Sequence, residues 1–499
     1  MAPSVQNTFR PAERDTLMAV LVMPRAGSGV PDPDLVDYAV DYARQKRVAY
    51  AEARYEHQTQ EQFILKNGVL DAVFVGEDQG VGVRVLVKGS LGFAATNTLT
   101  KPEVRATVDD AVKVAKASAR KTPITFAQED AVETEWSVPE RKRLADVPLD
   151  EKIREIGEMD KAVMALRYKV PARYFQMSNN RIQKYFANSE GSKIHSYSPR
   201  LRLFYFLTVA RDGDIEQTYR NYGWSGGWDG VRTLDWKEKV LEEARSMQRS
   251  LVEGKKSPEG KMDLVVGPQV SGIASHESCG HPTEADRVLG REASQAGKSF
   301  LAPEAIGTRV GSGLVNVVDD PTVEHAIAYY ETDDEGVRAR RRYLYKDGIV
   351  HEFLHNRETA AVLGTRSNGA ARAVNYNVEA IVRMANTFVE PKDHTVEELL
   401  EGVKLGVYMK SFMEWNIDDK RYNAKYAGRE AYLVEDGEVK HPVRNTIIEL
   451  TTPAFWSAVD AVGKDLEFEA GFCGKSDPGQ ALDASLGGPS MRLRNVSLR

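Results

Sequence analysis

The chain has 499 residues, of which 42% are hydrophobic and 28% charged, and its formal net charge is −6. This composition is ordinary for a globular protein, and the mild negative charge argues against a general nucleic-acid binder, so we expect no direct nucleic-acid partner. No segment approaches the roughly 18 to 20 consecutive apolar residues of a membrane span, and two cysteines are too few for a disulfide scaffold. We therefore expect a cytoplasmic protein with no membrane partner.

The first half of the chain alternates between helical and extended patterns. Residues 1–32 are predicted to be a flexible N-terminal segment, after which Asp32-Pro33 opens a helix. Strand patterns follow, separated by hairpin turns; they cover residues 49–58, 62–66, 70–75, 82–87 and 91–95. A second helix begins at Lys101. A helix, an antiparallel sheet and a further helix together indicate an α+β fold.

The same pattern continues to residue 254. Helices are expected at residues 149–167 and 235–253, and strands at 181–187, 192–198 and 200–211. A glycine- and proline-containing stretch then predicts a boundary between an N-terminal α+β domain, residues 33–254, and a C-terminal domain, residues 260–499. Strand signals dominate the second domain; they lie at residues 261–266, 314–318, 342–346, 432–435 and 446–450. We expect a mainly β domain that carries one distinctive helix.

That helix contains His276-Glu277-Ser278-Cys279-Gly280-His281. Two imidazoles with a carboxylate between them are parts of a hydrolytic metal site, and Cys473, between glycines in an expected loop, adds a distant thiol. Zinc takes nitrogen and sulfur ligands, and a catalytic site needs three from the protein. The sequence therefore predicts one Zn²⁺ per chain, bound by His276, His281 and Cys473. Glu277 would take a proton from the water on the metal.

The five-residue spacing of the two histidines constrains the local backbone. On a regular α-helix it rotates the second histidine by about 140° from the first. Both side chains can reach one ion only if the helix widens into a π-bulge or unwinds near Gly280, before Pro282. We therefore predict a helix from Pro268 to about Cys279, distorted at its end.

Each of these residues has an alternative interpretation. The histidines and cysteines could be buried core residues, and Cys279 competes with Cys473 as the third ligand. Glu284 and Asp286 could orient a ligand histidine or simply form an acidic helix end. Residues 338–342 contain four arginines. They predict a charged exposed turn, in preference to a binding site for an acidic partner. Tyr345, His351 and His355 could assist catalysis, although a solvated strand face is the simpler interpretation.

These residues resemble the TldD/PmbA family of metallopeptidases, specifically its TldD-type, metal-bearing branch. His276, Glu277 and His281 match the family's His-Glu-x-x-x-His, and Glu284 and Asp286 match the acidic residues after it. Cys473 in Gly-Phe-Cys-Gly-Lys matches the glycine-flanked cysteine that is the family's third metal ligand. Further similarity lies in residues 78–84, 317–320, 333–336, 383–387 and 406–408.

The resemblance implies a two-domain TldD/PmbA-like architecture and a zinc-dependent peptidase acting on unfolded or short peptides. It also implies that the peptide binds by strand addition to a sheet edge, which the sequence does not locate. The partner would be a second copy of the chain or a related subunit without the metal motif. Two alternatives are a non-catalytic scaffold or binding subunit of such a complex and a metal-dependent amidase of a non-peptide substrate.

Overall fold

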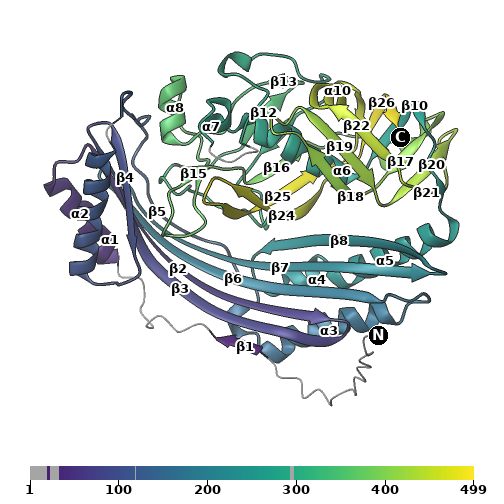
Figure 1. Cartoon of the computed structure of the whole chain (residues 1–499), viewed down its shortest axis with the longest axis horizontal. Helices are drawn as coiled ribbons and strands as arrows, with labels where there is room; N and C mark the ends of the chain where they lie inside the picture. Colours follow the sequence, from purple (N-terminus) through teal and green to yellow (C-terminus); the bar gives the residue numbers. More distant parts are fainter. Residues whose placement is uncertain (1–18, 23–32, 119, 293–296) are drawn as a thin grey trace, which may run out of the picture.

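The computed structural model describes residues 19–22, 33–118, 120–292 and 297–499. Figure 1 shows a long curved sheet, built by the first half of the chain, with the second half packed over its concave side. The predicted α+β class is confirmed, since helices flank the first sheet and strands dominate the second half. Of the segment expected to be flexible, only Ala19–Val22 is described, and it forms strand β1; the rest of that prediction lies outside the described residues.

The N-terminal sheet has eight strands in the order β1-β3-β2-β6-β7-β5, with β4 beside β3 and β8 beside β7. Most neighbours are antiparallel; β1 with β3 and β5 with β7 are parallel. The bounds are β2 Tyr50–Lys66, β3 Val69–Val87, β4 Ser90–Thr96, β5 Glu133–Ser137, β6 Ala172–Asn188, β7 Lys193–Arg211 and β8 Asp214–Ser225. The expected antiparallel sheet is therefore present, with longer strands than predicted.

The polar residues 59–61 explain why the predicted strands were too short. They suggested a break, but β2 runs through them without interruption. Strand β2 pairs with β3 on one side and β6 on the other along this whole stretch, so its backbone is hydrogen-bonded whatever side chains it carries. The Glu61 carboxylate is neutralised by the buried Lys152 ammonium.

Helices cover the two ends of this sheet. At one end α1 (Pro33–Gln45) and α2 (Lys101–Ala117) place their apolar sides on strands β2 to β4. At the other end α3 (Leu149–Met164) and α5 (Trp236–Glu253) form a second core with β6 and β7, beside the short α4 (Gly230–Thr233). None of the helices in the described part of the chain is both long enough and apolar enough to cross a bilayer.

The C-terminal half contains a ten-stranded and a six-stranded sheet that share one large apolar core. The first follows the order β18-β19-β22-β26-β10-β17-β20-β21-β9, with β23 beside β26, and the second the order β13-β12-β11-β16-β25-β24. Their bounds are β9 Lys255–Lys256, β10 Gly260–Val266, β11 Val317–Asp319, β12 Arg342–Lys346, β13 Ile349–Val350, β16 Asn386–Val389, β17 Leu405–Met409, β18 Phe412–Ile417, β19 Asn423–Gly428, β20 Ala431–Glu435, β21 Glu438–Arg444, β22 Ile447–Thr451, β23 Val459–Val462, β24 Glu467–Lys475, β25 Gln480–Gly488 and β26 Met491–Leu498.

Short elements complete this half. A two-stranded ribbon pairs β14 (Ala371–Arg372) with β15 (Ile381–Val382). The helices are α6 Pro268–Ser275, α7 Ala285–Val288, α8 Arg357–Leu363, α9 Val396–Glu401 and α10 Thr452–Ser457. Helix α6 packs against β16, β24 and β25. The mainly β half with one distinctive helix is thus as predicted.

The two halves are joined by two of the segments that resemble the TldD/PmbA family. Gly80 and Gly82 on β3 lie so close to Tyr376 that a Cβ on either would come within 2.1 Å of a Tyr376 atom. Arg84, on the same strand, forms ion pairs with Glu52 and, across the domain interface, with Glu335. Residues 78–84 and 333–336 therefore dock one half onto the other.

Candidate metal centre

The helix that holds the two histidines is distorted as the spacing predicts. It is α-helical from Pro268 to Ser275, π-helical from His276 to Gly280 and 3-10 from His281 to Thr283. The backbone N–H of His281 donates to the carbonyl of His276, which is the five-residue hydrogen bond of a π turn. The two imidazole rings consequently lie with their centroids 4.9 Å apart.

Cys473 lies beside these two rings. One potential ligand atom from each of His276, His281 and Cys473 lies within 4.8 Å of the others, and Cys473 Sγ is 3.5 Å from His281 Nε2. The expected loop around Cys473 is wrong: the residue lies within β24 and pairs with Leu482 of β25. Gly471 allows close packing against Leu486, because a Cβ at position 471 would lie 2.6 Å from the Leu486 side chain.

The protonation chemistry of the three residues fits zinc. All are buried, and burial lowers the pKa of both imidazoles, which keeps them neutral. Burial alone would raise the pKa of the Cys473 thiol, but His281 and Arg383 bring it down to about 7. His276 Nδ1 is buried without a hydrogen-bond partner among the described residues. Two neutral imidazoles, an acidic thiol and an orphaned ring nitrogen suit a metal ion.

Cys279, the rival ligand, does not belong to this group. It is fully buried, and burial raises the pKa of its thiol well above the usual value. A buried neutral thiol is a poor metal ligand, because the thiolate is the form that binds. The geometry therefore favours Cys473 over Cys279.

Glu277 is buried next to the histidines but contacts a residue that the sequence did not single out. The guanidinium of Arg421 lies 2.6 Å from the Glu277 carboxylate. Arg421 occupies the turn between β18 and β19, 144 positions along the chain, where Asp418-Asp419-Lys420-Arg421 has the composition of an ordinary solvated turn. No local signal in the sequence pointed to this contact.

Glu284 lies where a residue that orients a ligand histidine should be. Its carboxylate is 2.8 Å from His281 Nδ1, the ring nitrogen opposite Nε2, and 2.6 Å from Arg287 Nε. Burial opposes its ionisation, but Lys475 and Arg287 hold the pKa of Glu284 well below its usual value. The Asp286 carboxylate accepts a hydrogen bond from Lys475, at 2.7 Å, and not from the histidine.

Replacing Glu284 should loosen His281 and weaken metal binding. We expect Glu284→Gln to lower zinc affinity by about 10–100-fold, the usual range for partners of ligand histidines. Asp286→Asn is the matched control, since it removes a neighbouring carboxylate that contacts Lys475 and not the histidine. Competition with a chelator measures both affinities. Equal losses in the two variants would contradict an orienting role for Glu284.

Zinc affinity should also depend on pH through the Cys473 thiol. Because its pKa is about 7, the thiol is protonated below that pH and must release a proton to bind. Affinity should therefore fall by up to about tenfold per unit as the pH decreases below 7 and level off above it. The same chelator competition between about pH 5.5 and 8.5 tests this; a constant affinity across the range would refute it.

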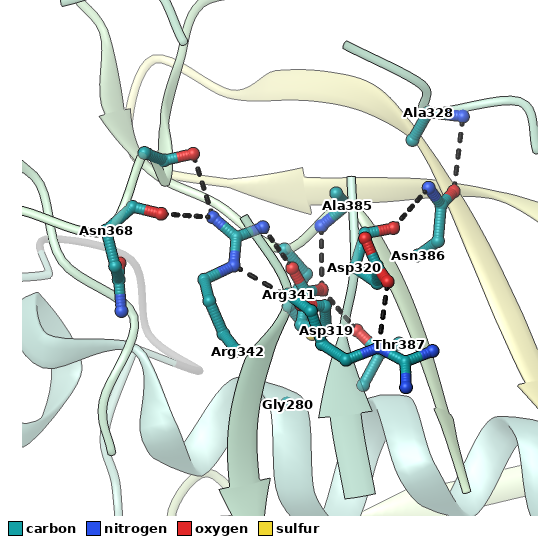
Figure 2. Close-up of polar contacts among 12 residues, drawn as sticks. Gly280, Asp319, Asp320, Ala328, Arg341, Arg342, Asn368, Ala385, Asn386 and Thr387 are labelled. Carbon is teal, nitrogen blue, oxygen red and sulfur yellow. Dashed lines mark hydrogen bonds and ion pairs between the residues drawn. The ribbon is translucent and has the colours of Figure 1, made fainter. Parts of the chain in front are cut away.

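Figure 2 shows a polar network that contains residues of two more of the segments that resemble the family, 317–320 and 383–387. Asp319 forms an ion pair with Arg342 and accepts from the Ala385 backbone and the Thr387 hydroxyl, both at 2.8 Å. The Thr387 carbonyl in turn accepts from Ser275 Oγ, at the last residue of α6, at 3.1 Å. Residues 317–320 and 383–387 therefore support the end of the metal helix.

The same network corrects the interpretation of the arginine-rich stretch. Arg338, Arg340 and Arg341 are exposed, as expected, but Arg342 is fully buried. Arg341, also drawn in Figure 2, pairs with Asp320, and Arg340 pairs with Glu352. These arginines have acidic partners within the chain, which weakens the case for an acidic-partner site.

The remaining candidates do not join the three ligand residues. Tyr345 is buried, and its hydroxyl donates to the carbonyl of Ser278 in the π turn, at 3.3 Å. His355 is buried, contrary to the solvated face expected of it, and lies 3.2 Å from the Thr359 hydroxyl. His351 is exposed. Tyr345 supports the π turn, and neither histidine belongs to the metal group.

Three profiles of one protein family match successive parts of the chain. They are described as PmbA/TldA metallopeptidase domain 1, at residues 51–117, the central domain, at 142–251, and the C-terminal domain, at 259–499. The first two divide the predicted domain 33–254, although both contribute strands to one sheet. The domain boundaries of the sequence analysis stay a prediction. All residues of the candidate metal centre fall within the third profile.

Curated relatives and solved structures span nearly the whole chain. A metalloprotease from Methanocaldococcus jannaschii is 30% identical over 446 residues, 89% of this chain and 95% of its own length. A zinc metalloprotease TldD homolog from Saccharolobus solfataricus is 26% identical over 461 residues, 91% and 98% of the two lengths. TldE from Thermococcus kodakarensis has a TM-score of 0.74 at 14% identity, covering 93% of this chain and 99% of that one. A proposed modulator of a DNA gyrase from Thermotoga maritima has a TM-score of 0.75 at 19% identity, with coverages of 93% and 99%.

Proposed function

The chain belongs to the TldD/PmbA family of metallopeptidases, and on this basis we propose that it is a zinc-dependent peptidase that hydrolyses unfolded or short peptides. The convergence of two neutral imidazoles and an acidic thiol beside a buried carboxylate carries the proposal. His276, His281 and Cys473 would hold one Zn²⁺ per chain. A zinc ion supplies a Lewis acid that polarises a peptide carbonyl and makes water more acidic.

Glu277 would act as the general base and then the general acid. Its carboxylate takes a proton from the attacking water as the oxygen–carbon bond forms. It then returns that proton to the amide nitrogen as the carbon–nitrogen bond breaks, which releases an amine and a carboxylic acid. Glu277 is suited to this cycle because it lies between the two histidines in the chain and does not belong to the ligand group.

The burial of the centre supports extended peptides as substrates. His276, Glu277 and His281 are 3–4% exposed and Cys473 is 7% exposed. A single extended chain is much thinner than the rigid surface of a folded protein, so we favour it as the substrate that reaches side chains at this depth. We therefore propose unfolded or short peptides as the substrates of this site.

Strand addition remains our proposal for how the peptide binds. Two strands that end their sheets adjoin the centre: β24 holds Cys473, and β18 leads into the turn that holds Arg421. On β24, the carbonyls of Gly471 and Cys473 already accept hydrogen bonds from Arg202 and Arg383. We favour β18 as the edge that pairs with the peptide backbone.

The partner and the location are also proposals. The names of the relatives support a complex of TldD and TldE type, in which this chain would supply the metal-bearing subunit to a second copy or to a metal-lacking relative. A cytoplasmic location rests on the two unpaired cysteines. Size measurement of the purified protein, alone and after mixing with a candidate partner, would identify the assembly.

Digestion of unfolded casein and short peptides by the zinc-loaded protein tests the proposed activity. We expect fragments that mass spectrometry detects, and their loss after chelation and their return with added zinc. Intact peptides despite one bound zinc per chain would contradict the proposal and favour the amidase of a non-peptide substrate. Activity that appears only with a second metal-bearing subunit, and survives Glu277→Gln in this chain, would identify it as the scaffold.

A further inference from the structure

The turn between β18 and β19 directs one arginine into the metal centre. We propose that Arg421 is a catalytic residue that binds the negatively charged oxygen formed when water adds to the scissile carbonyl. This inference rests on the proposed peptidase function. It concerns a residue outside the segments that resemble the TldD/PmbA family, and it is carried by the backbone, the burial and the hydrogen bonding of Arg421.

The backbone of Arg421 is held in an unfavourable conformation. Its φ is +65°, in the left-handed region that non-glycine residues rarely adopt. The Asp418 carboxylate accepts from the backbone N–H groups of Tyr422 and Asn423, at 2.8 and 3.1 Å, and the Thr452 hydroxyl donates to the Arg421 carbonyl at 2.7 Å. Conformations of this kind persist where the surroundings impose them, and they cluster at functional sites.

The side chain of Arg421 is buried but only partly hydrogen-bonded. It is 8% exposed, and one terminal nitrogen donates to Glu277 Oε2 at 2.6 Å. Its Nε–H is buried and has no acceptor among the described residues. A buried donor without an acceptor is unfavourable, and a charged one more so. An incoming anionic oxygen would satisfy the group that the resting protein leaves unpaired.

The charge balance of hydrolysis explains why the same guanidinium also contacts Glu277. In the resting protein Arg421 compensates the negative carboxylate. When Glu277 accepts the proton of the attacking water, the carboxyl becomes neutral, and the electron pair of the carbonyl π bond leaves a negative charge on the substrate oxygen. One negative charge has moved from the Glu277 carboxylate to the substrate oxygen, and Arg421 can stay paired with that charge. A fixed cation placed where charge develops is a strong form of transition-state stabilisation.

The alternative is that Arg421 only positions Glu277, and a phosphinic peptide separates the two roles. This probe carries an anionic tetrahedral group in place of the scissile bond. We compare Arg421→Met and Arg421→Lys with Lys420→Met, which removes the same charge from the exposed neighbouring residue. Each variant is made with Glu277 and with Glu277→Gln, and every protein is first loaded with zinc and checked for metal content and thermal melting.

We expect Arg421→Met to lower kcat by about 10²–10³-fold, the loss typical of one oxyanion donor, with little change in KM. Phosphinic-peptide affinity should fall by a similar factor whether position 277 is Glu or Gln. Affinity for the intact substrate peptide, measured in the Glu277→Gln background, should be the same with Arg421 and with Met at that position. Arg421→Lys should restore part of the loss, since it keeps the charge without the planar fork.

Two results would overturn the inference. A loss of phosphinic-peptide affinity that disappears in the Glu277→Gln background would mean that Arg421 acts only through Glu277. Turnover by Arg421→Met equal to that of Lys420→Met would exclude any catalytic role. Both outcomes differ from failure of the proposed function, in which the unmodified zinc-loaded chain does not cleave peptides at all.

Discussion

Glu277→Gln should abolish peptide hydrolysis while zinc stays at one ion per chain. The carboxamide matches the carboxylate in size and can still accept the hydrogen bond from Arg421, so the π turn keeps its shape. It cannot take a proton from water at neutral pH. Loss of a general base costs about 10²–10⁴-fold in rate, and here the acid that protonates the amine disappears with it.

Peptide digestion and elemental analysis of the same preparation test this prediction together. Glu449→Gln is the matched control, because it makes the same exchange on an exposed residue of β22 and should leave activity unchanged. If Glu277→Gln retained turnover with full zinc content, Glu277 would be removed from the mechanism. Lost turnover together with lost zinc would instead show that Glu277 maintains the metal centre.

Cys473→Ser should remove most of the zinc affinity. It replaces a thiol with a pKa of about 7, whose thiolate is a soft ligand, by a hydroxyl that stays neutral. The change deletes a direct ligand. The loss of zinc affinity should therefore exceed the factor of about 10–100 expected when a residue that orients a ligand histidine is replaced. Isothermal titration with zinc would measure it, and peptide digestion should fall in parallel.

Cys279→Ser is the matched control, because it makes the same substitution at the other buried cysteine. We expect it to lower the melting temperature, since a polar hydroxyl enters an apolar core, and to leave zinc affinity unchanged. The opposite pattern, with zinc lost from Cys279→Ser and kept by Cys473→Ser, would exchange the roles of the two cysteines.

The local distortion of the metal helix was predictable because it follows from spacing alone. Two histidines five positions apart cannot face one ion on a regular α-helix, and the π turn at His276–Gly280 is one of the two solutions that the spacing allows. The setting of Cys473 was not predictable in the same way. Its flanking glycines suggested a flexible loop, but Gly471 is needed for close packing within a paired strand.

The sequence by itself determined the α+β class, the helix with its widened turn, and the chemical types of the proposed metal ligands. These depend on residue type and on distances of a few positions along the chain. Only the tertiary structure brought Arg421 to Glu277 and buried Arg342 against Asp319. Those contacts join residues 144 and 23 positions apart. An isolated arginine in a charged turn looks the same whether it is solvated or buried, because its partner is chosen by the packing of sheets that no local pattern specifies.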